Sequence, residues 1–293
     1  MLFSVVFIVF LAGCARAPEG PTGQGVVITS FAPDVTTTDG GNPVTFVLSV
    51  KNVGEKTASS LRAMLFGLSD KWSSVSPGKD TLTAAQSLAP ADPVANLPGE
   101  ETTITWTANA ALGTTTDQAY DANVRVFYTY VTDGTALFRV VEASYLRTNP
   151  NVIRGLVSSD STGGPLLLTF SVRSPIVSAD TRTARVQLEL QNVGGGRVFT
   201  GAATPSISAT NLDTLTKIIV EGTNLKSCAG ADAVSGKVEL TTNVRLVGGK
   251  SKVVSCDIDV STATFQDIQL DVKIEYNYFV DSATQVTVLR ALQ

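Results

Sequence analysis

The residues with the most distinctive chemistry in this 293-residue chain are three cysteines, Cys14, Cys228 and Cys256. A cysteine can form a disulfide, carry a lipid, bind a metal or act as a nucleophile, depending on its surroundings. Histidine, the usual partner of cysteine in the last two roles, is absent from the sequence. Its absence excludes Ser-His-Asp and Cys-His catalysis and every zinc site that needs histidine. Attachment and cross-linking are therefore the chemistry that we expect of these cysteines.

Four aspartates in the C-terminal half come nearest to a metal site: Asp257, Asp259, Asp267 and Asp271. Carboxylates are the ligands that Ca²⁺ prefers, but calcium loops carry them at alternate positions in a dense run that contains glycine. That pattern is missing here, so we interpret the four aspartates as solvated strand residues. We expect no metal, no cofactor and no catalytic residue, and hence no enzymatic activity.

An apolar N-terminal segment gives Cys14 its context. Residues 1–13 carry no charge, and as a helix they span only about 20 Å, short of the ~30 Å hydrocarbon core of a membrane. They end in Leu11-Ala12-Gly13-Cys14, which resembles the lipobox of bacterial and archaeal lipoproteins. The resemblance implies a signal peptide, cleavage before Cys14 and a lipid on its sulfur. No Lys or Arg precedes the apolar run, so an uncleaved anchor and a cleaved signal without a role for Cys14 stay open as alternatives.

The other two cysteines, Cys228 and Cys256, are predicted to form a disulfide. With Cys14 committed to a lipid, they are the thiols left in an exported chain, where the compartment is oxidising. A bridge between them closes a loop of about 28 residues and stabilises the fold by roughly 3 kcal/mol in the chain-entropy model. It requires Cα atoms about 4.4–6.8 Å apart. Two buried free thiols are the alternative.

The composition favours strands and argues against nucleic acid as a partner. Charged residues make up 16% of the chain, below the roughly 25% of ordinary globular proteins. Hydrophobic residues make up 43%, which is enough for a packed core. The net charge is −4, and no basic stripe that would bind phosphates is present.

Matched sequence blocks recur in the two halves of the chain. VTFVLSVKNV over residues 44–53 corresponds to ARVQLELQNV over 184–193, at an offset of 140. VRVFYTYVTD over 124–133 corresponds to VKIEYNYFVD over 272–281, at an offset of 148. A third match, 97–106 with 246–256, lies between them in the same order.

The repeat predicts two units of one topology. Superposing them should place Asn52 on Asn192 and Tyr128 on Tyr276. Strands are expected where apolar residues alternate with others between turn formers such as Asp133-Gly134. In the first unit these are 26–31, 44–51, 60–68, 102–109, 123–131 and 136–146. In the second unit they are 166–171, 184–191, 218–221, 237–242, 251–260, 269–279 and 284–289.

Many short strands and about 125 residues per unit predict an all-β fold with two tandem immunoglobulin-like β-sandwich domains after an N-terminal signal or anchor segment. The strand ends Asn52-Val53-Gly54 and Asn192-Val193-Gly194 also resemble the CARDB-type and S-layer-associated Ig-like domains of archaeal and bacterial cell-surface lipoproteins. In those domains an Asn-x-Gly turn ends a core strand. The predicted organisation is a signal peptide with lipobox at 1–14, a flexible tether at 15–25, an Ig-like domain at 26–148, a linker at 149–164 and a second Ig-like domain at 165–293.

Two tryptophans bear on ligand binding, because exposed aromatic rings can stack on sugars. Trp106 lies in an alternating strand on the same face as Ile104, so we expect it in the core. It also falls at or next to the position of Cys256 in the repeat. Trp72 follows Ser69-Asp70-Lys71 and is expected to be exposed.

Export, a tether, a repeat and the lack of catalytic residues together predict a non-enzymatic, membrane-anchored cell-surface protein. We expect it to act as a spacer, an adhesion module or a subunit of a surface assembly. An extracytoplasmic accessory lipoprotein that binds carbohydrate or protein is the alternative. The expected partners are the membrane, through the lipid or the apolar segment, and other surface proteins or further copies of the chain.

Overall fold

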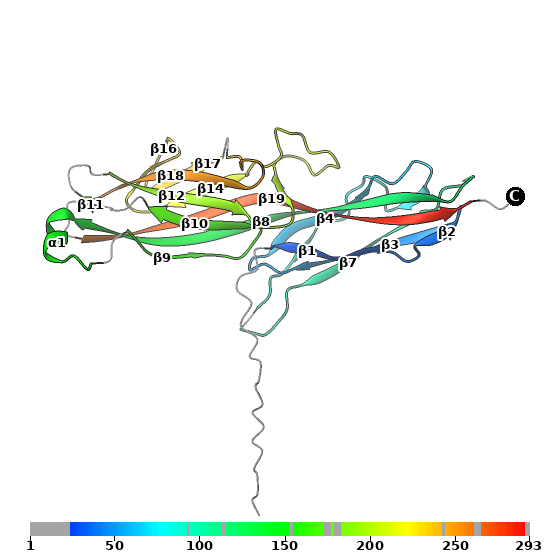
Figure 1. Ribbon diagram of the computed structural model, residues 1–293, viewed down its shortest axis with the longest axis horizontal. Helices are drawn as coiled ribbons and strands as arrows, with labels where there is room; N and C mark the ends of the chain where they lie inside the picture. The colour runs from blue at the N-terminus through cyan, green and yellow to red at the C-terminus, as the bar shows by residue number, and fades with distance from the viewer. Residues whose placement is uncertain are drawn as a thin grey trace, which may run out of the picture.

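The computed structural model of this chain describes residues 24–92, 94–112, 115–152, 155–172, 177–178, 183–241, 244–260 and 265–290. The expected signal peptide, Cys14 and most of the expected tether lie outside these ranges. The described part is all-β, with several antiparallel sheets and a single short helix, α1 (Ala143–Thr148). The predicted all-β class is confirmed. Figure 1 shows an elongated molecule with a lobe at each end.

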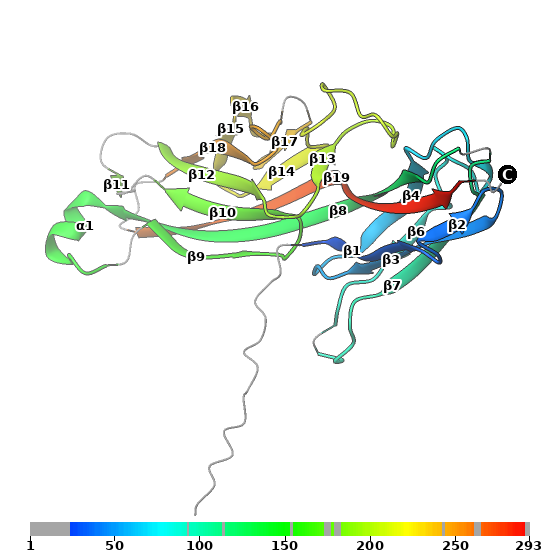
Figure 2. The ribbon, with the colours of Figure 1, turned by 45° about the vertical axis from the view of Figure 1, so that its right-hand side comes forward.

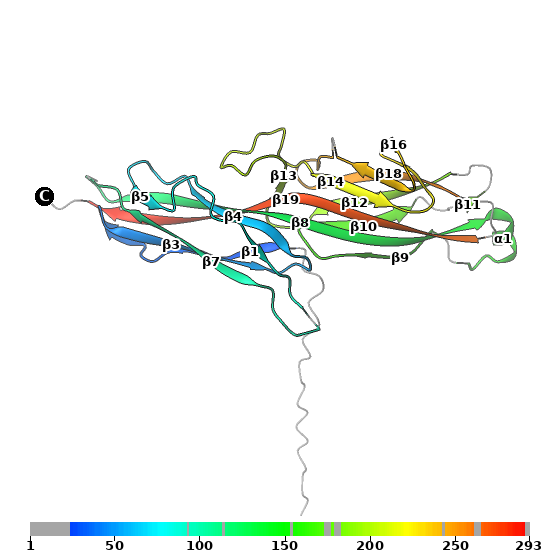
Figure 3. The same cartoon turned by 180° about the vertical axis from the view of Figure 1, so that it is seen from behind.

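Two strands of 25 residues each run through both lobes, β8 (Gln118–Glu142) and β19 (Phe265–Leu289). They pair antiparallel without a register shift, from Val288 opposite Gln118 to Phe265 opposite Val141. At about 3.3 Å per residue, each strand is about 80 Å long. Figure 3 shows the pair from behind as the one feature common to both ends. Even-numbered residues of both strands are buried along most of this length, so the same face meets the core in both lobes.

Lobe 1 packs a four-stranded sheet against one end of this pair. Its order is β1 (Val26–Pro33), β3 (Pro43–Asn52), β7 (Glu101–Asn109) and β5 (Ser73–Ser76). Three further strands extend the long sheet here: β4 (Ala58–Phe66), β6 (Gln86–Leu88) and β2 (Thr37–Asp39).

Lobe 2 packs a five-stranded sheet against the other end, as Figure 2 shows. Its order is β10 (Leu166–Val172), β12 (Thr183–Asn192), β18 (Ser251–Asp259), β15 (Leu225–Cys228) and β16 (Ala231–Asp232). The long sheet is extended by β9 (Gly155–Ser161), β11 (Val177–Ser178), β13 (Arg197–Phe199), β14 (Lys217–Glu221) and β17 (Lys237–Leu240).

The two lobes repeat each other's strand pairing. In lobe 1, β1 pairs with β3 so that Val26 faces Asn52, and in lobe 2, β10 pairs with β12 so that Leu166 faces Asn192. Both pairs are related by the offset of 140 found in the sequence. A short parallel strand also follows in each lobe, β2 on the end of β19 and β11 on the end of β8.

The predicted break in each long strand is wrong. Residues 123–131 and 136–146 were expected as two strands around a turn at Asp133-Gly134, and 269–279 and 284–289 as two more. Instead, Asp133 and Gly134 lie mid-strand opposite Lys273 and Val272. Gly134 packs closely there, because a Cβ at this position would lie 2.5 Å from a methyl group of Leu168 and would force that side chain to shift. The partner strand therefore overrides a local turn signal.

Two other expectations differ from the structure. Residues 149–164, expected as a linker, contain β9, which pairs with β8 from Gly134 opposite Ser161 to Arg139 opposite Gly155. The expected strand 136–146 ends at Glu142, and α1 begins at the next residue, Ala143. The Ser- and Gly-rich composition of 149–164 indicates a loop, but edge strands accept such residues because only one side of them meets the core.

Candidate functional site

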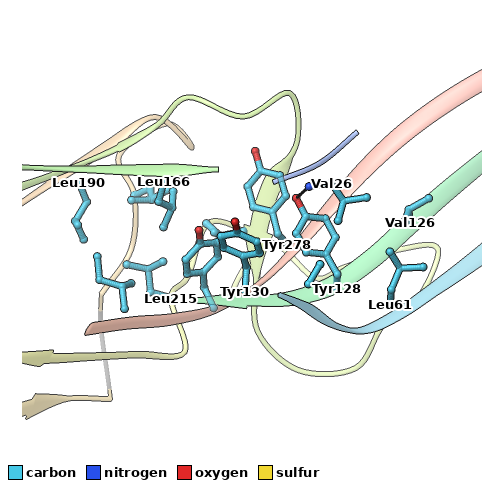
Figure 4. Close-up of a cluster of buried hydrophobic side chains, with 14 of the residues drawn as sticks. Val26, Leu61, Val126, Tyr128, Tyr130, Leu166, Leu190, Leu215 and Tyr278 are labelled. Atoms are coloured by element: carbon cyan, nitrogen blue, oxygen red, sulfur yellow. Dashed lines mark hydrogen bonds between the residues drawn. The ribbon is translucent and has the colours of Figure 1, made fainter. Parts of the chain in front are cut away.

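Four tyrosines form a cluster at the junction of the two lobes. Tyr128 and Tyr130 come from β8, and Tyr276 and Tyr278 from β19, directly opposite one another in the ladder. Ring centroids are 5.7 Å apart for Tyr128 and Tyr278 and 6.1 Å apart for Tyr130 and Tyr276. All four rings are buried, and Figure 4 shows three of them, Tyr128, Tyr130 and Tyr278, close to one another. Aromatic pairs at these spacings stabilise a core beyond their buried area.

Two of the hydroxyls hold corresponding turns in the two lobes. The hydroxyl of Tyr130 accepts a hydrogen bond from the N–H of Lys56 at 3.0 Å, and that of Tyr278 accepts one from the N–H of Gly196 at 2.9 Å. Lys56 and Gly196 are 140 residues apart, as the repeat requires. Each turn is therefore fixed by a tyrosine that belongs to a strand shared by both lobes.

The other two hydroxyls meet the first strands of the two small sheets. Tyr128 accepts a hydrogen bond from the N–H of Val26 at 3.2 Å, drawn in Figure 4. The hydroxyl of Tyr276 lies 2.9 Å from that of Thr132, which donates to the carbonyl of Leu166 at 3.3 Å. Val26 and Leu166 correspond in the repeat, so the predicted match of Tyr128 with Tyr276 extends to their partners.

Burial keeps these tyrosines protonated. It raises the pKa of Tyr130 and that of Tyr278 to about 12, and it raises the pKa of Tyr128 and that of Tyr276 as well. The cause in each case is the loss of water around the charged form. With such pKa values the hydroxyls are protonated near neutral pH and act as hydrogen-bonding groups.

The two Asn-Val-Gly segments are structural turns tied to this cluster. The Nδ2 of Asn52 donates to the carbonyls of Lys56 at 2.9 Å and Leu88 at 3.0 Å. The Nδ2 of Asn192 donates to the carbonyl of Gly196 at 3.0 Å. In lobe 2 the tyrosine cluster bonds directly to the Asn-Val-Gly turn, because the hydroxyl of Tyr278 donates to Oδ1 of Asn192 at 2.8 Å.

The predicted disulfide between Cys228 and Cys256 is present. The Cα atoms are 4.0 Å apart, closer than the expected range, because the two residues lie directly opposite each other in β15 and β18. Both cysteines are fully buried. The bridge therefore cross-links two neighbouring strands of the five-stranded sheet.

Lobe 1 carries an aromatic ring where lobe 2 carries this bridge. Trp106 lies opposite Phe46, and Cys256 lies opposite Val186, which corresponds to Phe46 in the repeat. Trp106 is fully buried, as expected.

The prediction that Trp72 is exposed is wrong. Its side chain is 5% exposed, and its ring lies 5.9 Å from that of Phe46 and 6.0 Å from that of Tyr120. The polar residues before it indicate a surface loop, yet the ring turns into the core of lobe 1. Within the described part of the chain, the large hydrophobic side chains that are exposed are all aliphatic, so the structure offers no aromatic platform there.

Three of the four aspartates considered as metal ligands bond to other side chains. Asp257 forms a bidentate pair with Arg185 and Asp267 one with Arg139, and each arginine holds the pKa of its carboxyl below the usual value. Asp271 accepts from the hydroxyl of Thr135 at 2.8 Å. Among the described residues, no three acidic or cysteine side chains come together as a metal site would require.

Ion pairs across β8 and β19 were not foreseen from the sequence. Arg125 forms a bidentate pair with Asp281 at 2.7 Å, and its guanidinium lies 4.2 Å from the ring centre of Phe279. At the centre of the ladder, Thr129 donates to the side-chain oxygen of Asn277 at 2.9 Å. The two residues of each pair lie directly opposite each other in β8 and β19. Predicting these pairs from the sequence would have required the register between residues some 150 positions apart.

A small cleft opens beside the junction. It has a volume of about 220 Å³ and lies between the start of β1, at Gly25 and Val26, and the stretch of β19 around Asp281 and Ser282. Pockets for small molecules are usually larger, about 300–1,000 Å³. The cleft is therefore a weak candidate for a ligand site.

Cys14, the predicted lipid site, and residues 1–13 lie outside the described residues. In the part of the chain that is described, no helix has the length and apolar character needed to cross a membrane.

Comparisons with known proteins give no family. No family model matches the chain, and no curated protein matches it. Among solved structures, the chain is similar to the collagen adhesin of S. aureus, with 9% identity and a TM-score of 0.14, over 92% of this chain and 94% of that one. It is also similar to the CupB6 tip adhesin of Pseudomonas aeruginosa, with 10% identity and a TM-score of 0.14, over 92% of this chain and 98% of that one. TM-scores this low carry no argument about fold or function.

Proposed function

We propose that this chain is a non-enzymatic, membrane-anchored cell-surface protein whose two immunoglobulin-like sandwiches form a rigid spacer. In this role it holds one lobe away from the membrane, as an adhesion module or as a subunit of a surface assembly. The CARDB-type resemblance of the Asn52 and Asn192 turns belongs to the same proposal.

The observation that carries the proposal is the continuous pairing of β8 with β19. Tandem domains joined by a flexible linker move relative to each other, because few contacts cross the boundary. Here two hydrogen-bonded strands of 25 residues pass through the junction, and the tyrosine cluster packs at that point. Bending the molecule there would break ladder hydrogen bonds and separate buried aromatic rings, so stiffness is the property that this construction supports.

The buried disulfide supports an extracytoplasmic location. Disulfides form and persist in oxidising compartments and are rare in the cytosol. The bond between Cys228 and Cys256 is fully buried, which shields it from reductants.

Anchoring is tested by Cys14→Ser in the native host, with Cys228 and Cys256 left intact. We expect the unchanged protein in the membrane fraction, accessible to protease on whole cells and carrying added lipid mass on a chain that begins at Cys14. The variant should leave the membrane fraction or remain unprocessed. A mature chain that begins elsewhere, or one without lipid mass, would remove the lipoprotein part of the proposal.

A further inference from the structure

Among the described residues, one edge of β19 has no hydrogen-bonded partner strand over part of lobe 1, although β1 runs close to it; this stretch is called the open edge. On the side away from β8, β14 covers residues 271–275, β13 covers 277–279 and β2 covers 287–289. No described residue pairs with this side of β19 between Val280 and Val286.

The backbone groups on this edge point outward at alternate residues. The N–H of Thr287 donates to the carbonyl of Thr36 at 2.9 Å, so it points away from β8. Because β8 and β19 pair without a shift and backbone direction alternates along a strand, Asp281, Ala283 and Gln285 point their N–H and C=O groups the same way. A row of such groups is a template for an added strand.

Lobe 2 carries a strand at the corresponding place. The offset of 148 relates Asp281 to Asp133 of β8, whose outer side is covered by β9. Pairing begins with Thr162, whose N–H donates to the carbonyl of Asp133 at 2.9 Å. In return the N–H of Asp133 donates to the hydroxyl of Thr162 at 3.0 Å. Four residues after Thr162, β10 begins at Leu166.

The sequence before lobe 1 matches this connection in length. Thr22-Gly23-Gln24-Gly25 precedes Val26 as Thr162-Gly163-Gly164-Pro165 precedes Leu166, at the offset of 140. The carbonyl of Gly25 accepts from the N–H of Val53 at 2.8 Å, and that of Pro165 accepts from the N–H of Val193 at 2.9 Å. The connections therefore end in the same way, and the cleft of about 220 Å³ between Gly25 and Asp281 lies on the path toward the open edge.

We propose that residues 19–22 of this chain add to the open edge of β19 as an antiparallel strand, in the place that β9 holds on β8. The two offsets put Thr22 opposite Asp281 and Gly20 opposite Ala283, both at hydrogen-bonding positions. Pro21 then faces Ser282 at a position whose nitrogen points to solvent, where proline is tolerated. Pro18 faces Gln285 at a hydrogen-bonding position, where it lacks the N–H and ends the pairing.

The added strand comes from the same molecule and not from a second copy. The open stretch is bounded by β13 at one end and by β2 at the other, so β19 of a second copy could not lie along it without meeting these strands. The chain's own segment reaches the edge through the same four-residue connection that serves lobe 2.

This pairing would set the direction of the membrane anchor, a consequence that rests on the proposed attachment at Cys14. Val26 lies at the junction, against Tyr128 (Figure 4). If residues 19–22 were unpaired, the chain toward Cys14 would extend away from the folded part at Val26, midway along the long strands. A paired segment runs along β19 toward the end of lobe 1, so the lipid would sit at that end and lobe 2 would stand outermost.

Disulfide trapping tests the pairing in the full chain with Cys14→Ser, which needs no membrane. Glu19 and Thr284 should form a non-hydrogen-bonded pair with Cα atoms about 4.5 Å apart, a distance that a disulfide accepts. We expect E19C/T284C to close an intramolecular bond under mild oxidation, seen as loss of alkylatable thiols in a monomer. The matched control E19C/A283C should stay reduced, because Ala283 points to the opposite face.

Three outcomes would overturn the proposal: covalent dimers of E19C/T284C, which would indicate donation by a second copy; equal cross-linking in both variants; or none in either. Amide exchange provides a second measurement. Gly20→Pro should speed exchange at Ala283 about tenfold or more by disrupting the local pairing, and unchanged exchange would contradict it. None of these results depends on lipid attachment, so the failure of anchoring and the failure of pairing are distinguishable.

Discussion

Tyr130 and Tyr278 make the same hydrogen bond from opposite strands of one ladder. Each hydroxyl accepts from the N–H four residues beyond a corresponding asparagine, Lys56 after Asn52 and Gly196 after Asn192. The matched residues of the two sequence repeats therefore come together in the tyrosine cluster where the lobes join. The contribution of this cluster to the free energy of unfolding can be measured by substitutions there.

Removing these two hydroxyls should weaken both lobes by similar amounts. Tyr130→Phe and Tyr278→Phe each leave a backbone N–H without its partner, which costs about 1–3 kcal/mol. Urea unfolding, with the slope checked for a single transition, measures the loss. Tyr120→Phe is the matched control, since its hydroxyl donates to the exposed side chain of Gln118, and we expect a change within about 0.5 kcal/mol. A loss in one junction variant but not in the other would mean that the two turns are not equivalent.

Loss of the disulfide should destabilise the protein by about 3 kcal/mol, the value for a loop of this length. C228A/C256A is the variant of choice, because both sites are fully buried and serine would place unpaired hydroxyls in the core. Urea unfolding of this variant is compared with that of the unchanged protein, with and without reductant. If the variant were as stable as the oxidised protein, the bridge would not be a significant cross-link.

Alkaline pH should unfold the protein through the same junction. Folding raises the pKa of Tyr130 and of Tyr278 from about 10 to about 12. Their contribution to folding stability is therefore complete below pH ~10 and is lost as the pH rises through ~12. Between these two pH values only the unfolded state releases the two protons. Ultraviolet titration of phenolate formation, with a denatured sample as control, checks this. Ionisation of all six tyrosines near pH 10 in the native protein would contradict the burial of the cluster.

The repeat was readable from the sequence because its anchors are residues with demanding environments. Asn52 and Asn192 each supply an amide that bonds carbonyls within a turn, and Tyr128 and Tyr276 fill the junction. Few other side chains could replace them. The disulfide was readable for a similar reason, since two thiols in an oxidising compartment have few other fates.

The long strands were not readable, because their continuity is a tertiary effect. Asp133-Gly134 has the composition of a turn, and only the pairing with Val272 and Lys273 keeps it extended. Trp72 was misplaced for the same reason. Its neighbours in sequence are polar, while the rings that bury it, Phe46 and Tyr120, come from other strands.

The stiffness of the junction is tested most directly by the spread of distances between the lobes. Spin labels on T105C in β7 and E189C in β12, both exposed, report on opposite lobes, and T105C/D121C provides a control within lobe 1. Pulsed electron–electron double resonance on the Cys14→Ser protein should give a distance distribution with one peak for T105C/E189C. This peak should be about as narrow as that of the control. A broad or multiple distribution, as flexibly linked domains give, would contradict the account of β8 and β19 as a continuous rigid connection.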